Sequence, residues 1–366
     1  MLRKGRSLAG AALACLLAHA TAFCAVSPVL ALRGGAQGVM GTRMMSGQKV
    51  PTVELNDGTQ HPMIGYGTYK VGFVPASASA AAGGLQTPGE TQVTARACVG
   101  EALAAGYRFL DCAQFYGNEG EVGKAIEDSQ VPREDLFLAS KVWNDKIYEG
   151  AAAVRAQVEK TLADLQTEYL DLYLVHWPVP GGKHVEAYLE LEKLQAQGKV
   201  RSIGVSNYAV EDLEELMAAC SVPPAINQIE VNPFLYRKNT IDFCQQKGIQ
   251  MQSYRSLRDG KAFADPTVAD LATKYNRSPA QVLGRWCLQK NIIYIPKSVK
   301  RERMEENKAV LDFEITSEDM ARLDALTTAA TLQAFKELYE KCVVRDTPYA
   351  GTPEGEALVR RHITLD

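Results

Sequence analysis

Short apolar runs alternate with amphipathic segments along most of this 366-residue chain, and this alternation constrains the fold more than any other feature. Eight runs are predicted strands: 63–68, 107–112, 136–142, 169–177, 200–207, 225–231, 248–254 and 292–296. Segments between them place apolar residues at helical spacing: 93–106, 150–166, 184–198, 210–220, 239–248 and 265–290. Strands that alternate with helices predict an α/β fold with a parallel sheet. Eight such units fit a single closed (β/α)8 TIM barrel better than an open doubly wound sheet.

The barrel is predicted to occupy residues 51–331. An Asp57-Gly58 turn between short alternating runs predicts an N-terminal β-hairpin. Residues 71–90 form a low-complexity insertion of Ala, Gly and Ser after the first strand, for which a solvated linker and a lid both stay open. Residues 332–366 form a C-terminal extension with one helical stretch, LQAFKELYEKC, and an irregular, charged end.

The first 53 residues contain no Asp or Glu and carry six Lys or Arg residues. Within them, MLRKGRS is a basic region, LAGAALACLLAHA a short apolar core, and Ala20-Thr21-Ala22 a small-residue cleavage pattern typical of a signal peptide. The residues that follow stay basic and small, as in an organelle transit segment. We therefore expect residues 1–50 to be a bipartite presequence that leads to a plastid. Secretion, or a cytoplasmic protein that starts at Met44 or Met45, remains the alternative.

The rest of the chain is acidic, because the overall charge of −3 becomes −9 once those six cations are set aside. Nucleic-acid binding requires a clustered basic face, so no nucleic-acid partner is expected. No internal window approaches the length of a membrane span, which predicts no membrane association of the mature form. Six widely spaced cysteines lack metal-ligand spacing and are expected to be reduced, buried thiols: Cys98, Cys112, Cys220, Cys244, Cys287 and Cys342.

Polar side chains close nearly every apolar run. They are Thr68, Asp111, Lys141, His176, Ser206, Asn207, Gln228, Tyr254, Lys297 and Ser298. Strand C-terminal ends meet on one face of a parallel barrel, so these side chains should share a rim. Singly each has a structural explanation: Asp111 as a helix cap, Lys141 as a surface cation, His176 as a core residue. Structural roles do not, however, explain why several titratable groups should gather on one rim.

Together with Tyr116, these groups make a proton-transfer unit. A tyrosine has a pKa of about 10, too high for efficient proton exchange at neutral pH unless a cation stabilises the phenolate. Lys141 is that cation, Asp111 its counter-ion, and His176 can orient a carbonyl oxygen. A carbonyl that receives a proton must also receive hydride, which indicates a redox cofactor. The segment KSVKRER supplies cations at a helix start, where phosphate binds well, while no G-x-G-x-x-G follows any strand.

Three segments between residues 106 and 307 resemble, in order, the three signatures of the aldo-keto reductase family: GYRFLDCAQFYGNEGEVG, KVRSIGVSNY and IPKSVKRERMEEN. The resemblance implies a monomeric NADPH-dependent reductase of aldehydes, ketones or keto-sugars. It makes Tyr116 the general acid, Lys141 and Asp111 the pair that lowers its pKa, and His176 the residue that orients the carbonyl. A non-catalytic NADP(H)-binding regulatory or sensor protein on the same barrel is the alternative. All four catalytic positions are present, which favours the enzyme.

The resemblance also implies a cofactor site, with no metal. The carboxamide is expected to be held by Ser206, Asn207 and Gln228, and the nicotinamide to stack on Tyr254. The 2′-phosphate is expected to be bound by Lys297, Ser298 and Arg303, and the adenine to be contacted by Glu306 and Asn307. Further cofactor contacts are Gly67, Thr68, Tyr69 and Val299, and the substrate-pocket wall is Tyr69, Trp143 and Trp177. Two departures from the family pattern are Phe109 and the sequence Tyr254-Arg255-Ser256-Leu257, in place of Tyr-Ser-Pro-Leu.

Overall fold

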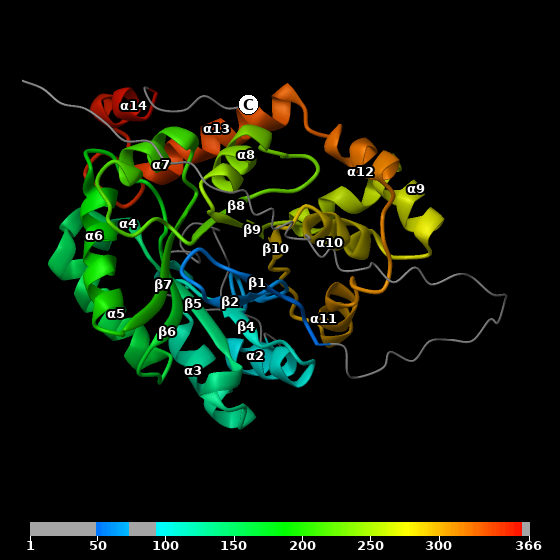
Figure 1. The fold of residues 1–366 in the computed structure, drawn as a ribbon, viewed down its shortest axis with the longest axis horizontal. Coiled ribbons are helices and arrows are strands. Elements are labelled where there is room, and N and C mark those ends of the chain that lie inside the picture. The colour runs from blue at the N-terminus through cyan, green and yellow to red at the C-terminus, as the bar shows by residue number, and fades with distance from the viewer. Residues whose placement is uncertain (1–48, 73–92, 361–366) are drawn as a thin grey trace, which may run out of the picture. The chain divides into compact units, whose positions relative to one another are not determined.

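The computed structural model describes residues 49–72 and 93–360, and eight strands of this part form one parallel sheet (Figure 1). They are β3 (Tyr66–Gly67), β4 (Phe109–Asp111), β5 (Phe137–Val142), β6 (Leu170–Val175), β7 (Val200–Ser206), β8 (Ile226–Glu230), β9 (Gln250–Tyr254) and β10 (Ile293–Tyr294). Each strand lies inside one of the eight apolar runs. The strand predictions are therefore confirmed.

The strands follow one another in sequence order around the sheet, and the first and last strands meet to close it. The closure is short: a parallel bridge joins Ile64 to Tyr294, and the amide of Gly65 donates to the carbonyl oxygen of Tyr294 at 2.9 Å. The amide of Gly67 donates to the carbonyl oxygen of Pro296 at 3.0 Å. The predicted (β/α)8 barrel is confirmed.

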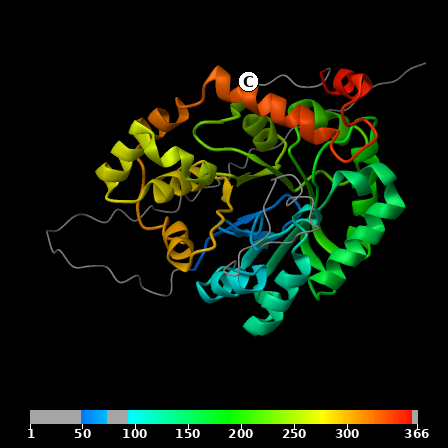
Figure 2. The same ribbon diagram turned by 180° about the vertical axis from the view of Figure 1, so that it is seen from behind.

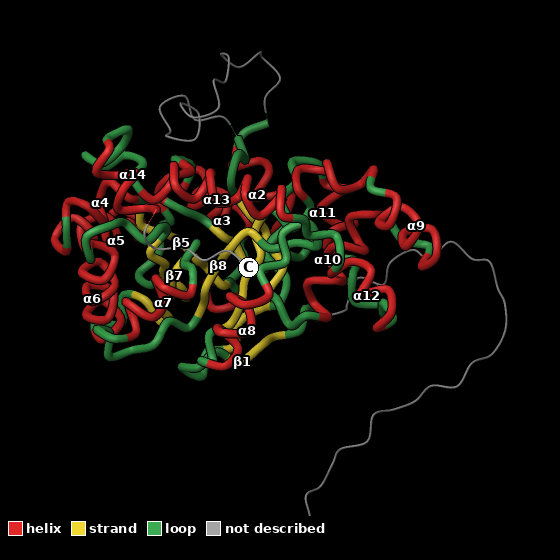
Figure 3. Tube along the Cα trace, turned by 90° about the horizontal axis from the view of Figure 1, so that it is seen from above, coloured by secondary structure: helices red, strands yellow, loops and turns green. Residues whose placement is uncertain are grey.

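Helices lie outside the strands (Figures 1 and 3). They are α2 (Ala95–Ala104), α3 (Glu119–Ser129), α4 (Asn144–Glu149), α5 (Ala151–Asp164), α6 (Lys183–Ala196), α7 (Val210–Met217), α8 (Lys238–Gln246), α9 (Pro266–Tyr275), α10 (Pro279–Gln289), α11 (Arg301–Lys308) and α12 (Ser317–Asp324). Short 3-10 turns occur at η1 (Gln114–Tyr116), η2 (Arg133–Asp135) and η3 (Arg258–Ala264).

One helix prediction needs correction, and three helices of the described barrel lie outside the predicted segments. The segment 265–290 is two helices, because Asn276 adopts a left-handed φ of 50° that ends α9. Ser278 then caps α10 with Pro279 at its first turn, so a new helix starts. Helices α3, α4 and α12 were not predicted. The sequence of α3, EGEVGKAIEDS, contains two glycines that weaken the helical signal.

The predicted hairpin consists of β1 (Thr52–Glu54) and β2 (Gln60–Pro62), which pair antiparallel. It crosses the middle of the ring in Figure 1, drawn in blue. The buried ring of His61 packs against Phe109 and Phe137, the first residues of β4 and β5, at centroid distances of 4.6 and 4.1 Å. The hairpin therefore covers the end of the barrel where the strands begin.

Phe109 fits into this floor because Gly65 faces it. A Cβ atom built on Gly65 would lie 2.1 Å from a ring carbon of Phe109, far closer than two atoms can approach. Phe109, which departs from the family pattern, therefore fits because Gly65, directly before the neighbouring strand β3, has no side chain.

The C-terminal extension holds two helices, α13 (Ala329–Val343) and α14 (Pro353–Arg360). The expectation of an irregular end after the first helix is wrong, because α14 lies there. Figure 2 shows α13 in orange along one edge of the ring. The hydroxyl of Tyr339 in α13 donates to Asp212 of α7 at 2.7 Å, which joins the extension to the barrel.

The predicted presequence, 1–50, and the insertion, 71–90, lie almost wholly outside the described residues; only 49, 50, 71 and 72 are included. Within residues 49–72 and 93–360, none of the helices is both long and apolar enough to cross a membrane. The six cysteines there are free; four are buried as predicted, whereas Cys220 and Cys342 are half-buried. No group of three or more His, Cys, Asp or Glu in that part of the chain is arranged to hold a metal ion.

Candidate active site

The four titratable residues converge at the ends of neighbouring strands. Asp111 is the last residue of β4, Lys141 lies one residue before the end of β5, and His176 directly follows β6. Tyr116 ends the turn η1, which leaves β4 and returns over the same rim. Gly117 stops that turn with a φ of 66°, a conformation that favours glycine. The rim predicted from the sequence is thus formed.

Lys141 is the centre of the cluster. Its side chain is fully buried, and its ammonium donates to Oδ1 of Asp111 at 2.7 Å, to the carbonyl oxygen of Cys112 at 2.8 Å, and to Oη of Tyr116 at 3.3 Å. An ammonium has three donors, so every one is used. Asp111 Oδ1 also accepts from Nε2 of Gln228 at 2.7 Å. The buried cation is therefore both paired and fully hydrogen-bonded.

The expectation that Lys141 and Asp111 lower the pKa of Tyr116 is not met in this pocket. Burial, followed by the charge of Asp111, raises the pKa of Tyr116 well above its usual value. The Lys141 charge, which Asp111 partly balances, does not outweigh the cost of desolvating a phenolate in this pocket. Tyr116 is consequently a protonated phenol at neutral pH, as a proton donor must be.

His176 is neutral. Burial, and then the charge of Lys141, lowers its pKa well below the usual value. The imidazole meets the Trp143 ring edge to face at 4.9 Å and the Tyr116 ring at 6.1 Å. Its backbone carbonyl oxygen accepts from Nδ2 of Asn207 at 3.0 Å, which fixes the end of the strand. A neutral imidazole in this place can donate one hydrogen bond to a carbonyl oxygen.

The residues expected around the nicotinamide continue the same network. Ser206 Oγ donates to the carbonyl oxygen of Gln228 at 2.8 Å, and Tyr254 Oη donates to Oδ1 of Asn207 at 2.7 Å. Asn207 has a left-handed φ of 65°, and its side-chain amide links His176, after β6, with Tyr254 on β9. Thr68 Oγ1 donates to the carbonyl oxygen of Asp111 at 2.9 Å. The rings and amides expected to hold a nicotinamide thus adjoin the titratable cluster.

The expected phosphate clamp lies between β10 and α11. Lys297 and Arg303 are exposed, and the side chain of neither forms a hydrogen bond or ion pair with the described residues. Ser298 is buried and holds the turn, its Oγ accepting from the amide of Lys300 at 3.1 Å. No side chain caps the first turn of α11. The amide of Arg303 donates to the carbonyl oxygen of Lys300 at 3.1 Å, so the amides of Arg301 and Glu302 are the ones left for an anion. Two unpaired cations beside such a helix start fit a phosphate.

The other expected cofactor residues lie around this clamp. Val299 is exposed, Glu306 half-buried and Asn307 buried. Gly67 lies on β3 at the seam, the junction of β3 with β10 that closes the barrel. A Cβ atom at Gly67 would lie 3.3 Å from the carbonyl oxygen of Ile295. Gly67 thus faces the segment that leads from β10 to the clamp, and Glu306 and Asn307 follow that segment on α11.

The pocket wall includes residues that the sequence did not identify. Phe115 stacks on Trp143 at 4.0 Å, and Tyr339 of α13 meets Trp177 edge to face at 5.8 Å. Asp346 accepts a hydrogen bond from Nε1 of Trp143 at 2.7 Å. The expected wall residues Trp143 and Trp177 are therefore covered by the C-terminal extension, whose sequence carries no motif that signals this.

Arg255 is the departure that follows Tyr254. It adopts a left-handed φ of 49°, and its guanidinium pairs with Glu230 at 3.0 Å and Asp259 at 3.3 Å. Ser256 replaces the turn proline and shares a hydrogen bond with Ser253 at 2.6 Å. The turn is thus held by side-chain contacts in place of the ring of a proline.

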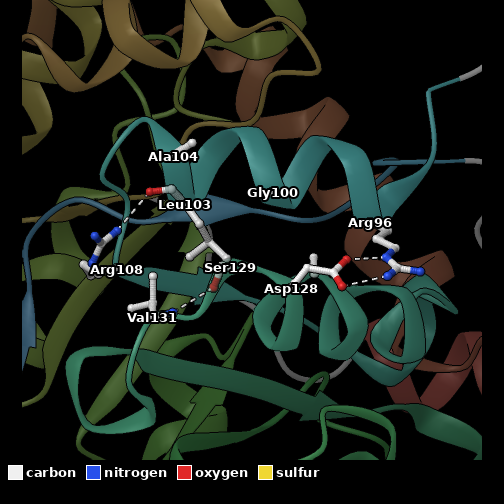
Figure 4. Close-up of a pocket in the computed structure, with 9 residues that line it drawn as sticks. Arg96, Gly100, Leu103, Ala104, Arg108, Asp128, Ser129 and Val131 are labelled. Carbon is white, nitrogen blue, oxygen red and sulfur yellow. Dashed lines mark hydrogen bonds and ion pairs between the residues drawn. The ribbon is translucent and has the colours of Figure 1, made fainter.

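A depression of about 430 Å³ lies elsewhere, between α2 and α3 on the outside of the barrel (Figure 4). The ion pair of Arg96 with Asp128 spans it, and Arg108 donates to the carbonyl oxygen of Leu103. It contains none of the rim residues. We therefore assign it no part in the chemistry.

The chain is similar to known proteins in both sequence and structure. The aldo/keto reductase family model matches residues 80–328. The chain is 43% identical over 276 residues to the uncharacterized oxidoreductase YtbE of Bacillus subtilis, covering 74% of this chain and 91% of that protein. It is 40% identical over 275 residues to the glyoxal reductase of the same organism, covering 75% and 92%. A variant of Gox0644 in complex with NADPH has a TM-score of 0.67 and 34% identity, covering 78% of this chain and 96% of that one.

Proposed function

The chain belongs to the aldo/keto reductase family, and we propose that it reduces an aldehyde, ketone or keto-sugar to an alcohol with Tyr116 as the proton donor. Membership of this family makes it an NADP(H)-binding, NADP-dependent oxidoreductase of carbonyl compounds. The donor residue and the substrate class are the proposal. The observation that carries it is the fully hydrogen-bonded Lys141, which lies 3.3 Å from the Tyr116 hydroxyl.

The proton is the part of the reaction that this chain supplies. NADPH, when bound, provides the hydride that reaches the carbonyl carbon. Tyr116 Oη gives its proton to the carbonyl oxygen as negative charge develops there. An alkoxide is a stronger base than a phenolate, so even a tyrosine of raised pKa can protonate it. The phenolate left behind faces the Lys141 ammonium, which is already fixed in place and need not reorganise.

His176 orients the substrate. A neutral imidazole donates to the carbonyl oxygen without competing with Tyr116 as an acid, because its own pKa is lowered well below the usual value. The aromatic rings of Phe115, Trp143 and Trp177 form an apolar wall that excludes water. Ser206, Asn207, Gln228 and Tyr254 would hold the nicotinamide, and Lys297, Ser298 and Arg303 the 2′-phosphate.

The test is a Tyr116→Phe variant assayed with NADPH and a reactive aldehyde such as 4-nitrobenzaldehyde. We expect turnover to be abolished while NADPH binding stays within about twofold, since the phenyl ring still packs against Tyr69. A variant that keeps most of its rate would remove Tyr116 as the acid. If the wild-type protein bound NADPH but was silent across a broad carbonyl panel, the sensor or regulatory function would replace the enzymatic one.

The name of the glyoxal reductase relative supports small aldehydes as the first substrates to examine. We propose a substrate among aldehydes, ketones and keto-sugars. A turnover screen of these compounds with NADPH and NADH would identify it. A preference for a non-carbonyl compound would exclude the proposal.

We also propose that residues 1–50 direct the protein to a plastid, as their basic, acid-free composition suggests. A fusion of these residues to a fluorescent protein should then accumulate in plastids. Fluorescence in the secretory pathway or the cytoplasm would support the alternatives.

A further inference from the structure

Two buried tyrosines hold the segment that carries the expected phosphate clamp. Tyr66, on β3, donates through its hydroxyl to the carbonyl oxygen of Ser298 at 2.5 Å. Tyr107, just before β4, donates to the carbonyl oxygen of Met304 at 2.8 Å. Each residue is 1% exposed. The first two strands of the barrel thus fasten a segment that follows the last strand.

The sheet cannot hold this segment by itself. Strand β10 has only two residues, and the bond from the amide of Gly67 to Pro296 is the last backbone hydrogen bond that we find across the seam in the described chain. Ser298 lies two residues beyond that bond. The Tyr66 hydroxyl therefore continues the attachment where the strand pairing stops.

The two hydrogen bonds bracket the clamp. Ser298 is itself a clamp residue, and Met304 directly follows Arg303 in the first turn of α11. The two rings also meet edge to face at 5.6 Å, so they form one support. Burial raises the pKa of both phenols, which keeps each hydroxyl protonated and able to donate at neutral pH.

We propose that Tyr66 and Tyr107 are positioning residues for cofactor selection, which hold Ser298 and Arg303 in the geometry that binds the 2′-phosphate of NADPH. This inference rests on the clamp assigned above. Neither tyrosine contacts the reacting groups in the described structure, so they act through the clamp. Their hydroxyls should affect the choice between NADPH and NADH rather than the affinity for nicotinamide dinucleotides in general.

The chain offers a matched control in Tyr294, a fully buried tyrosine on β10. Its hydroxyl has no hydrogen-bond partner among the described residues. Replacing it by phenylalanine removes the same atom from the same seam without releasing a carbonyl group of the clamp. It therefore reports the general cost of losing a buried hydroxyl there.

The experiment measures dissociation constants of NADPH and NADH by fluorescence titration of the substrate-free protein, for the wild type and for Tyr66→Phe, Tyr107→Phe and Tyr294→Phe. For the first two variants we expect the NADPH constant to rise about three- to tenfold, the value of one hydrogen bond. The NADH constant should change less than about twofold, and Tyr294→Phe should leave the ratio of the two constants unchanged. Thermal melting shows that each variant is folded, and Tyr107→Phe gives the same measurement if Tyr66→Phe does not fold.

Equal weakening of NADPH and NADH, or no change in either, would overturn the proposal. In an Arg303→Ala background, Tyr107→Phe should lose most of its effect, because the Met304 carbonyl group that Tyr107 holds directly follows Arg303; full additivity would also contradict the proposal. The result is separate from the proposed catalysis, since binding is measured without substrate. An enzyme without carbonyl turnover could still show the selective loss, and an active reductase could lack it.

Discussion

The titratable cluster and the phosphate clamp lie on the same rim but are built in opposite ways. Lys141 is buried, and all three of its donors are used by Asp111, Cys112 and Tyr116. Arg303 in the clamp is exposed and has no ion-pair partner among the described residues. The first arrangement holds charge for a chemical step. The second leaves charge for a ligand to use.

This difference follows from what each site must do. A group that supports proton transfer has to be in place before the transition state, so its hydrogen bonds are made within the protein. A charged group contributes most to the affinity for a charged ligand when that ligand displaces water and not an ion-pair partner within the protein. Burial with complete pairing therefore indicates chemistry on this rim, and exposed cations beside a helix start indicate binding.

The most damaging way to break the cluster is Lys141→Met. The variant leaves Asp111 buried without its cation, so we expect the free energy of unfolding to fall by about 3 to 5 kcal/mol. Turnover should fall about a hundredfold to ten-thousandfold, because the phenolate of Tyr116 loses its stabilising charge. Chemical denaturation and steady-state kinetics measure the two effects.

The double variant Asp111→Asn/Lys141→Met separates these effects. Both charges are then absent, and stability should recover most of the loss while turnover does not. Recovery of turnover as well would show that the charge pair is only structural. Loss of stability equal to that of the single variant would contradict the view that an unpaired carboxylate is the cause.

The sequence was sufficient to place this cluster, because barrel geometry determines where a residue at the end of a strand must lie. Asp111, Lys141 and His176 each close an apolar run, and parallel strands carry such ends to one rim. The direction of the Tyr116 pKa was not predictable in the same way. It depends on whether desolvation or the Lys141 charge dominates, and only the structure shows how deeply the ring is buried.

Contacts between distant parts of the chain were also not predictable from the sequence. The bond from Trp143 to Asp346 joins residues 203 positions apart, and neither belongs to a motif that names the other. The support of the clamp by Tyr66 and Tyr107 spans 232 and 197 positions. Periodicity identifies elements and their exposed faces, whereas such pairings depend on how the completed barrel closes.

The clamp is tested by Arg303→Ala. Loss of a charge-assisted bond should weaken NADPH by about 1.5 to 3 kcal/mol and leave NADH nearly unchanged. Because Arg303 is exposed, the difference should shrink as salt is added. Titration of both cofactors at low and high salt measures this.

Arg301→Ala is the matched control, since Arg301 lies on the same helix but already pairs with Glu101 at 2.8 Å and Glu305 at 3.0 Å. It should change neither cofactor appreciably. Equal losses of NADPH and NADH in Arg303→Ala would refute the selective role of Arg303. A large selective loss in Arg301→Ala would place the clamp on the wrong arginine.

The smallest effect concerns Glu119, a buried carboxylate that lacks the partner Asp111 has. It accepts from Ser140 Oγ at 2.6 Å and Thr161 Oγ1 at 3.2 Å, and burial raises its pKa to about 7 from an ordinary value of 4.5. Between these values the folded protein keeps a proton that the unfolded chain releases, so the free energy of unfolding falls as pH rises through this window. Glu119→Gln should remove its share of that slope, while Asp212, whose pKa burial also raises to about 7, keeps its own. The variant should be more stable than the wild type at pH 8, on the order of 1 to 3 kcal/mol. Urea unfolding from pH 5 to 8 measures it, with the half-exposed Glu121→Gln on the same helix as a control that keeps the wild-type slope. If the slope did not change in Glu119→Gln, the hydroxyls of Ser140 and Thr161 would stabilise the Glu119 carboxylate as well as Lys141 stabilises Asp111. That result would contradict the contrast between a buried carboxylate with a cation and one without.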